Sequence, residues 1–449
     1  MKYLPTTFAV LGLSALTLAP PASAQIPMSS ASSAPKPRPT GRISTFADAW
    51  SSDPDEGPTR GVHQLITSAA FRAAETEENG IDYGVDVRHS GLSGGSRPDR
   101  MSINEGFVGA RLGSGRVRVR GGHIWLNDLG ALGSVAGGHV EMRQSPTTRS
   151  PLGRWRIGGF YGAEPKIFET GYFNGVKKFG AYVALDGEAG RRHSVGYVKV
   201  LDRSLTERSV VTTANFLTAR RTFFLYQAAE YDLVQPAGQA KAGLNYFFTN
   251  ARVNATRRVE FQSTYNRGRS VDTRGLADDM VNGRVISQSA ALGLAYESLG
   301  GRVTVEPIKR VRVYAGLSQD KSNREDKPAG RRVVGGYAPN VGGSGFDLAA
   351  SDTRTHRTTG SYHSDYVSIG RQVGRRLYAS GDYTTSLSIV QFSRSDGILI
   401  EDKPTTKRLS GTGSINVGAT TSLQITIDRT WDRGVREFRI LSGVSYRFR

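Results

Sequence analysis

The sequence predicts an all-β fold: a transmembrane, antiparallel, up-and-down β-barrel of about 18 strands (16–20), with short periplasmic turns and longer extracellular loops. Three observations predict it. Strand-length segments of alternating polarity recur from about residue 81 to the end of the chain. Aromatic residues stand near the ends of many apolar faces, and short connections alternate with long ones.

The last two segments show the alternation most clearly. In the final segment the apolar set is Phe438, Ile440, Val444, Tyr446 and Phe448, and the polar set is Glu437, Arg439, Ser445 and Arg447. The segment before it alternates in the same way from Leu423 to Trp431. A period of two sends the two sets to opposite faces of a sheet. A soluble β-sandwich would show the same period, so the alternation alone leaves both folds open.

Two further features favour a membrane barrel. Aromatic residues near segment ends suit the girdles that barrels place at headgroup depth; they are Trp125, Tyr161, Tyr314, Tyr383, Trp431, Tyr446 and Phe448. The opposite face carries Arg, Asp, Gln, Thr and Gly, which suits a wet lumen. The connections at 113–115, 372–376 and 418–422 are short, whereas those at 267–284, 319–357 and 393–407 are long.

The number of strands follows from the segments. About 18 can be counted, at 81–90, 101–112, 116–126, 137–144, 154–163, 176–185, 191–202, 208–217, 221–232, 240–250, 257–267, 286–305, 309–319, 358–372, 376–393, 407–418, 422–432 and 436–449. A barrel of this size leaves an aqueous channel instead of an interior filled by side chains.

The first 80 residues are predicted to lie outside the barrel. Lys2, a short apolar run at 8–18 and the small residues Ala22 and Ala24 predict a signal peptide over 1–24. The apolar run is too short to span a bilayer as a helix. Residues 25–80 are expected to form a flexible periplasmic segment, with a short helix or an extra strand as alternatives, and the barrel is expected over 81–449.

The carboxy-terminal residues resemble a known signal. Gly443, Tyr446 and Phe448 match the insertion signal at the end of bacterial outer-membrane β-barrel proteins, although here Arg449 follows the last aromatic and Leu441 replaces a polar residue. Over 81–449 the chain resembles this porin-like class, with no subfamily indicated. The resemblance implies a bacterial outer-membrane location. It also implies contact with outer-membrane lipids, lipopolysaccharide and the barrel-assembly machinery, and it leaves a homo-oligomer open.

The charge is strongly positive, since 59 Lys and Arg stand against 40 Asp and Glu. Seven arginines near predicted turns alternate with apolar residues, and parity therefore sends them into the lumen: Arg116, Arg118, Arg120, Arg154, Arg156, Arg310 and Arg312. On the lipid face at mid-membrane each would cost about 2–4 kcal/mol. Rings of arginine favour anions. The alternative is that these side chains anchor the barrel to headgroup phosphates.

Two connections are candidates for a constriction. Residues 126–136 are unusually apolar for an outer loop, and could fold into the lumen, pack against a neighbouring subunit or belong to a longer hairpin. The long stretch 319–357 is the second candidate for a lid or constriction.

No chemistry is indicated. The chain has no cysteine, its seven histidines show no metal-ligand spacing, and no cofactor motif appears. His363, Ser364 and Asp365 resemble a catalytic triad in composition, but on a strand His363 and Asp365 share one face and Ser364 lies on the other. We therefore expect no catalytic, metal or cofactor site, no nucleic-acid partner, and no enzyme.

The expected function is passive: an outer-membrane, porin-like channel for the diffusion of small hydrophilic, anionic solutes. An export conduit or secretion-assembly partner, for example for an acidic polysaccharide, is the first alternative. A structural or adhesive barrel is the second.

Overall fold

The computed structural model describes residues 39–73, 79–93, 99–145, 153–166, 169–187, 191–203, 205–219, 222–234, 243–282, 284–285, 293–323, 325, 327–357, 360–393 and 399–448. The predicted signal peptide lies outside these residues. The first strands are β1 (Thr40–Pro54), β2 (Arg60–Arg72), β3 (Gly80–Ser93), β4 (Arg100–Leu112), β5 (Val117–Trp125), β6 (Ser134–Arg143), β7 (Arg154–Pro165), β8 (Tyr172–Asp186), β9 (Arg192–Asp202), β10 (Leu205–Ala219) and β11 (Phe223–Val234).

The remaining strands are β12 (Gly243–Asn254), β13 (Val259–Ser270), β14 (Leu294–Ile308), β15 (Val311–Ser322), β16 (Ala329–Ala338), β17 (Phe346–Arg357), β18 (Gly360–Val373), β19 (Leu377–Ser393), β20 (Leu399–Asp402), β21 (Thr405–Val417), β22 (Thr421–Asp432) and β23 (Val435–Phe448). The short helices are η1 (Asn127–Gly133), α1 (Thr273–Val281) and η3 (Val341–Gly343). In the described ranges no helix is long and apolar enough to cross a membrane.

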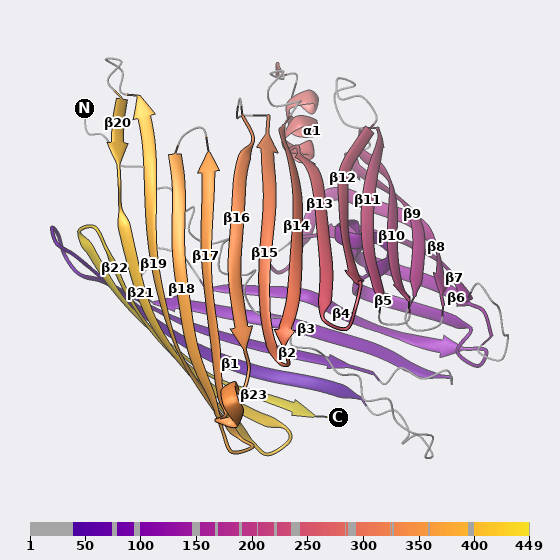
Figure 1. Cartoon of the computed structure of the whole chain (residues 1–449). Helices are drawn as coiled ribbons and strands as arrows, with labels where there is room; N and C mark the ends of the chain where they lie inside the picture. Colours follow the sequence, from indigo (N-terminus) through magenta and orange to yellow (C-terminus); the bar gives the residue numbers. More distant parts are fainter. Residues whose placement is uncertain are drawn as a thin grey trace. The chain divides into compact units, whose positions relative to one another are not determined.

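The strands form one closed antiparallel ring. Each strand pairs with the next along the chain, and β23 returns to pair with β1 over the whole length of both (Figure 1). The short β20 pairs only with β19, and β19 pairs on with β21. Of the 23 strands in the described residues, 22 therefore make the ring.

The predicted count of about 18 is too low. Each predicted segment corresponds to a strand, but β1, β2, β16 and β17 were missed. Residues 25–80 are thus not a flexible segment throughout, because the barrel begins at Thr40, and the long connection predicted at 319–357 is a hairpin of two strands.

Three of the four missed strands share a cause: the outward faces of β1, β16 and β17 are not consistently apolar. The outward row of β2 does contain Leu65 and Phe71, and an extra strand was one of the alternatives left open for this segment. In β1 the outward row contains the small residues Ala47, Ala49 and Ser51. In β16 and β17 it contains Arg332 and Asp352, which breaks the expected polarity. A period-two pattern is visible in a sequence only where the two faces differ in polarity.

The outer face of the ring is apolar and exposed. Val119 pairs with Val140, and Val183 pairs with Val195, with all four side chains on the outside. Other exposed apolar residues share this parity, among them Val108, Ile157, Leu299, Leu317, Val367, Ile369, Leu409, Ile415, Ile425 and Ile427. A closed antiparallel barrel with an apolar exterior leaves no unpaired edge in hydrocarbon. The chain is therefore a transmembrane barrel of the outer-membrane type.

The aromatic residues follow this parity with one exception. Trp125, Tyr161 and Tyr383 are exposed on the outer face. Tyr314 was predicted for the apolar face but points inward, where its hydroxyl lies over Gly335 and Arg302 covers its ring at 3.8 Å from the centroid.

The two ends of the barrel differ. The end that contains Thr40 and Phe448, here named the terminus end, has tight turns in which glycines adopt positive φ, such as Gly113 (60°), Gly374 (64°) and Gly418 (85°). The opposite end, the loop end, carries η1, α1 and β20 (Figure 1). The predicted asymmetry of connections holds, although the loop end also has the two-residue turn after β22.

The closing strand contains the three residues of the predicted insertion signal. Gly443 pairs with Phe46, and an added Cβ at Gly443 would lie 2.1 Å from the Phe46 ring. The Phe448 ring lies over Gly41 in the same way, and its centroid is 5.3 Å from that of Phe71. The seam between the first and last strands is therefore packed by aromatic rings over glycines.

We predict that Phe448→Ala weakens barrel closure. The substitution removes an aromatic pair worth about 0.5–1.5 kcal/mol at the strand that completes the ring. The fraction of protein that migrates as a folded barrel on unheated denaturing gels should fall. Phe438→Ala, on the outer face of β23 but away from this ring cluster, is the control; equal folded fractions for the two variants would contradict the prediction.

Candidate solute pathway and its constriction

The apolar loop after β5 folds into the barrel. Leu126, Leu129 and Leu132 are buried, and η1 contacts β8, β9 and β10. Their cluster includes Ile124, Val135, Val198 and Val210, each with no exposed surface. Val198 and Val210 lie on the inner face, because their neighbours Val195 and Tyr197 are exposed outside. The sequence left three possibilities open for 126–136, and the structure shows the first of them: the loop folds into the lumen, with its leucines buried within the barrel itself.

The approach of η1 depends on the local sequence. Gly130 has φ 58°, which lets the short helix bend. Gly196 on β9 leaves room for the loop, since an added Cβ would lie 2.2 Å from Leu129 Cδ2. The Ser194 hydroxyl donates to the Asp128 carbonyl at 3.2 Å. Burying one leucine contributes about 1.5–3 kcal/mol, so three of them stabilise this position substantially.

An ionic cluster attaches η1 to the wall. The Arg156 guanidinium, only 7% exposed, lies 3.0 Å from Asp128 and 2.8 Å from Glu141, and it also pairs with Asp186. Arg192 Nε lies 3.0 Å from Asp128. The cluster joins β6, β7, β8 and β9 to the loop. Truncation of one partner in such a buried pair costs about 3–5 kcal/mol.

The predicted arginine cluster divides into two groups. Arg118, Arg120 and Arg156 line the inner face, as parity indicated, but carboxylates accompany them: Asp82 lies 3.1 Å from Arg118 and 2.6 Å from Arg120. The sequence did not reveal these acids, because they come from other strands.

The other four arginines are exposed near the terminus end. Arg116 and Arg310 lie in turns, and Arg310 has φ 71°. Arg154 begins β7, and Arg312 is the second residue of β15, with Glu306 3.9 Å away. The structure does not gather the seven into one patch, since β15 is far around the ring from β5 and β7.

The helix α1 rests against the same sector from the loop end. Arg274 pairs with Glu207 at 2.9 Å and with Glu164, and Thr273 Oγ1 donates to Glu207 at 3.0 Å. Burial lowers the pKa of Arg274, but the two carboxylates outweigh burial and raise this pKa above its usual value. The Phe173 ring lies beneath the guanidinium at 4.2 Å.

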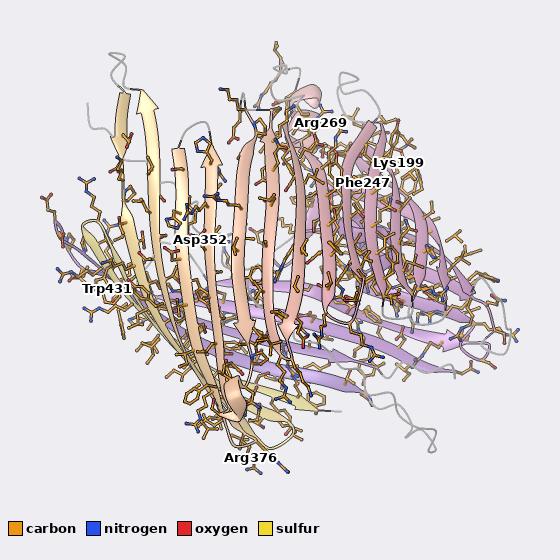
Figure 2. The ribbon with its side chains drawn as sticks, in the orientation of Figure 1. Lys199, Phe247, Arg269, Asp352, Arg376 and Trp431 are labelled. Atoms are coloured by element: carbon orange, nitrogen blue, oxygen red, sulfur yellow. The ribbon has the colours of Figure 1, made fainter. Side chains whose placement is uncertain are left out.

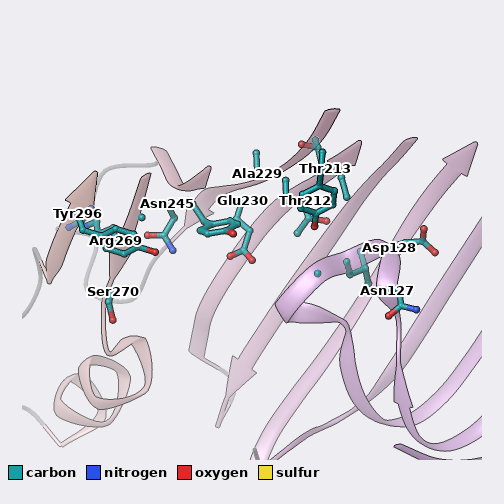
Figure 3. Close-up of a pocket in the computed structure, with 17 residues that line it drawn as sticks. Asn127, Asp128, Thr212, Thr213, Ala229, Glu230, Asn245, Arg269, Ser270 and Tyr296 are labelled. Carbon is teal, nitrogen blue, oxygen red and sulfur yellow. The ribbon is translucent and has the colours of Figure 1, made fainter. Parts of the chain in front are cut away.

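A cavity of about 480 Å³ lies between η1 and the inner wall that β10 to β14 form beside it. Figure 3 shows Asn127 and Asp128 of η1 on one side and Glu230, Asn245 and Tyr296 on the other. The wall is contributed by β10 to β14, and its lining side chains include Thr212, Tyr226, Glu230, Asn245, Tyr246, Ser270 and Tyr296. Sequence reasoning missed this cavity because no segment alone indicates it.

A polar cluster interrupts the outer face. His363 Nε2 lies 2.7 Å from Asp352 Oδ2 and 3.4 Å from Asp365, and Arg354 lies 3.3 Å from Asp352 (Figure 2 labels Asp352). His363 and Asp365 share the outer face and Ser364 lies on the inner one, as predicted. Within the described residues, these two carboxylates and the imidazole are close enough together for one metal ion, a spacing that the sequence did not show.

Comparisons with known proteins found similarity only at low sequence identity, and only among solved structures. No protein-family model matches the chain, and no curated protein matches it in sequence. Among solved structures, it is similar to OccAB4 of Acinetobacter baumannii (TM-score 0.45, 9% identity, 92% of this chain and 98% of that one). It is also similar to the P pilus usher (PapC) translocation pore (0.49, 9%, 90% and 99%). A third is OccK8 (OprE) of Pseudomonas aeruginosa (0.42, 8%, 92% and 98%). The assignment to outer-membrane barrels rests on the closed ring and its apolar exterior.

We predict that Arg156→Met releases η1 from the wall. The variant leaves the carboxylates of Asp128, Glu141 and Asp186 close together, at a cost of about 3–5 kcal/mol. Amide hydrogen exchange across 126–133 should become about 100-fold faster or more. Arg439→Met, which breaks the Asp48 pair on a distant strand, should leave this exchange unchanged.

If Arg156→Met fails to fold, Leu129→Ala removes the apolar part of the same anchor without leaving unpaired charge. Slow exchange of 126–133 in a folded variant of either kind would show that η1 is held by other contacts.

Proposed function

We propose that the barrel is a passive channel through which small hydrophilic solutes diffuse past η1. The observation that carries the proposal is the position of η1, which contacts β8 to β10 on their inner face and is ion-paired to Arg156 of β7. A ring of 22 strands encloses a lumen wider than side chains can fill. One part of the lumen is therefore narrowed, and among the described residues no element like η1 lies against the inner face of β17 to β22.

The uncovered wall supports this proposal by its chemistry. From β17 to β22 many inward positions are small and hydroxylated, including Ser351, Thr353, Ser364, Ser368, Ser380, Thr384, Ser410, Thr412 and Thr426. Tyr366, Tyr378 and the ion pair of Arg408 with Asp428 lie on the same wall. Hydroxylated side chains of this kind are well hydrated, and they bind a passing solute only weakly. Conduction requires interactions weak enough for the solute to leave.

Any preference for anions would arise at the terminus end. The inner arginines Arg118, Arg120 and Arg156 are paired with carboxylates, which reduces their field. The exposed group near the turns, Arg116, Arg154, Arg310 and Arg312, stands closer to the mouth. We therefore propose a modest anion preference set at this mouth.

The barrel's surroundings follow from its exterior. Arg332 and Lys407 lie on the outer face toward the loop end. Basic side chains at this depth suit the phosphates of lipopolysaccharide. We propose that lipopolysaccharide contacts this rim, that the loop end faces outward, and that the assembly machinery recognises Gly443, Tyr446 and Phe448.

We predict that replacing 127–133 by a Gly-Ser linker raises single-channel conductance in planar bilayers. Removal of η1 takes an inserted loop out of the lumen and so widens the pathway beside β8 to β10. An otherwise matched replacement of the turn 433–434, at the loop end but outside the lumen, should leave conductance unchanged. Absence of any conductance in the unaltered protein would refute the channel and favour an export or structural role.

We predict that the combined change of Arg116, Arg154, Arg310 and Arg312 to Gln lowers the anion-to-cation permeability ratio toward one. Four positive charges are lost at the mouth, and their effect should be greatest at low salt. Reversal potentials in salt gradients measure the ratio. Arg433→Gln, at the opposite end, is the control; a ratio that the fourfold variant leaves unaltered would place selectivity elsewhere.

A further inference from the structure

The cavity beside η1 is built as a binding site and not only as a passage. Its volume of about 480 Å³ falls within the range of about 300–1,000 Å³ in which proteins hold small molecules. Part of its wall is a loop fixed by buried leucines and ion pairs, and the rest is sheet. Its shape is therefore set before a solute arrives.

Three tyrosines give this cavity an aromatic wall. Tyr246, Gly268 and Tyr296 form one row across β12, β13 and β14, and an added Cβ at Gly268 would lie 2.4 Å from the Tyr296 hydroxyl. Tyr296 thus leans over the glycine toward Tyr246. Tyr226 lines the cavity from β11, with Phe248 at 5.8 Å between ring centroids. Flat rings of this kind pack against the C–H faces of another ring.

A buried hydroxyl in the same wall lacks a partner. Thr212 on β10 is only 3% exposed, lines the cavity, and its Oγ1 makes no hydrogen bond to the described residues. A buried polar group without a partner costs about 1–3 kcal/mol. Because this oxygen is itself buried, a solute hydroxyl would recover this energy once the Thr212 side chain rotates toward the cavity.

The charges around the cavity do not suit an anion. The Asp128 carboxylate is engaged by Arg156 and Arg192, and Arg208 serves two carboxylates, Glu230 at 2.9 Å and Asp232 at 2.9 Å. Apart from Arg269, which also lines the cavity, an entering anion would meet carboxylates whose cations are already occupied. An entirely apolar solute would leave the buried Thr212 hydroxyl without a partner.

We propose that this cavity binds a neutral saccharide during passage, an inference that rests on the proposed channel function. The C–H face of the saccharide ring would pack on Tyr246 and Tyr296. The saccharide hydroxyls would bond to Thr212 and the neighbouring polar groups. Binding of this kind would lengthen the time that neutral saccharides spend in the lumen, whereas other small solutes would diffuse through without binding.

Equilibrium binding to the full chain in detergent tests the proposal, with tritiated maltose as the neutral probe and tritiated glucuronate as the anionic one. Maltose should bind saturably, and glucuronate more weakly. Tyr246→Ala and Tyr296→Ala should each weaken maltose binding about 3- to 10-fold. Thr212→Val should also weaken binding, without lowering thermal stability, because its hydroxyl has no partner to lose.

The matched control is Tyr378→Ala. Tyr378 also leans over a glycine of the neighbouring strand, Gly370, on an inner wall away from this cavity. It should leave maltose binding unchanged. Absence of saturable maltose binding, tighter binding of glucuronate, or an equal loss in Tyr378→Ala would overturn the saccharide site.

Bilayer conductance of the same preparations separates this inference from the channel proposal. Conductance without maltose binding rejects the saccharide site alone. Maltose binding without conductance rejects the channel but leaves a saccharide-binding barrel.

Discussion

The pairing of β1 with β23 is the constraint on which the rest of the structure depends. In hydrocarbon no water can satisfy an unpaired strand edge, so the sheet must close on itself. Closure gives every residue of the ring a fixed side, because successive side chains alternate between lipid and lumen. The apolar exterior, the polar interior and the inward position of the arginines all follow from it.

Closure does not determine how the lumen is filled, and here one loop makes the lumen asymmetric. The sector of β5 to β10 contains buried leucines, valines and dense ion pairs, whereas the sector of β17 to β22 presents short hydroxylated side chains. The loop 126–133 can enter because Gly196 leaves space and Arg156 supplies a cation for Asp128.

The sequence could predict features that depend on neighbours along the chain. Period-two polarity gave the strands wherever the outer row was apolar, and the leucines at 126–132 indicated an inserted loop. It failed at β1 and β17, whose outer rows are small or charged. Features that combine distant strands were invisible: Asp82 beside Arg118, Asp352 beside His363, and the row of Tyr246, Gly268 and Tyr296.

The net charge is a second case in which the sequence alone does not reveal how residues from distant strands pair. An excess of 19 positive charges suggests a strongly anion-attracting lumen, yet the potential inside a pore depends on unpaired charge at each depth. Arg156 and Arg118 lie inside but face Asp128 and Asp82, so their fields largely cancel. Exposed cations such as Arg116 and Arg310 lie at the turns, and Lys407 lies on the outer rim. Their fields are greatest at the ends of the barrel and beside the headgroups.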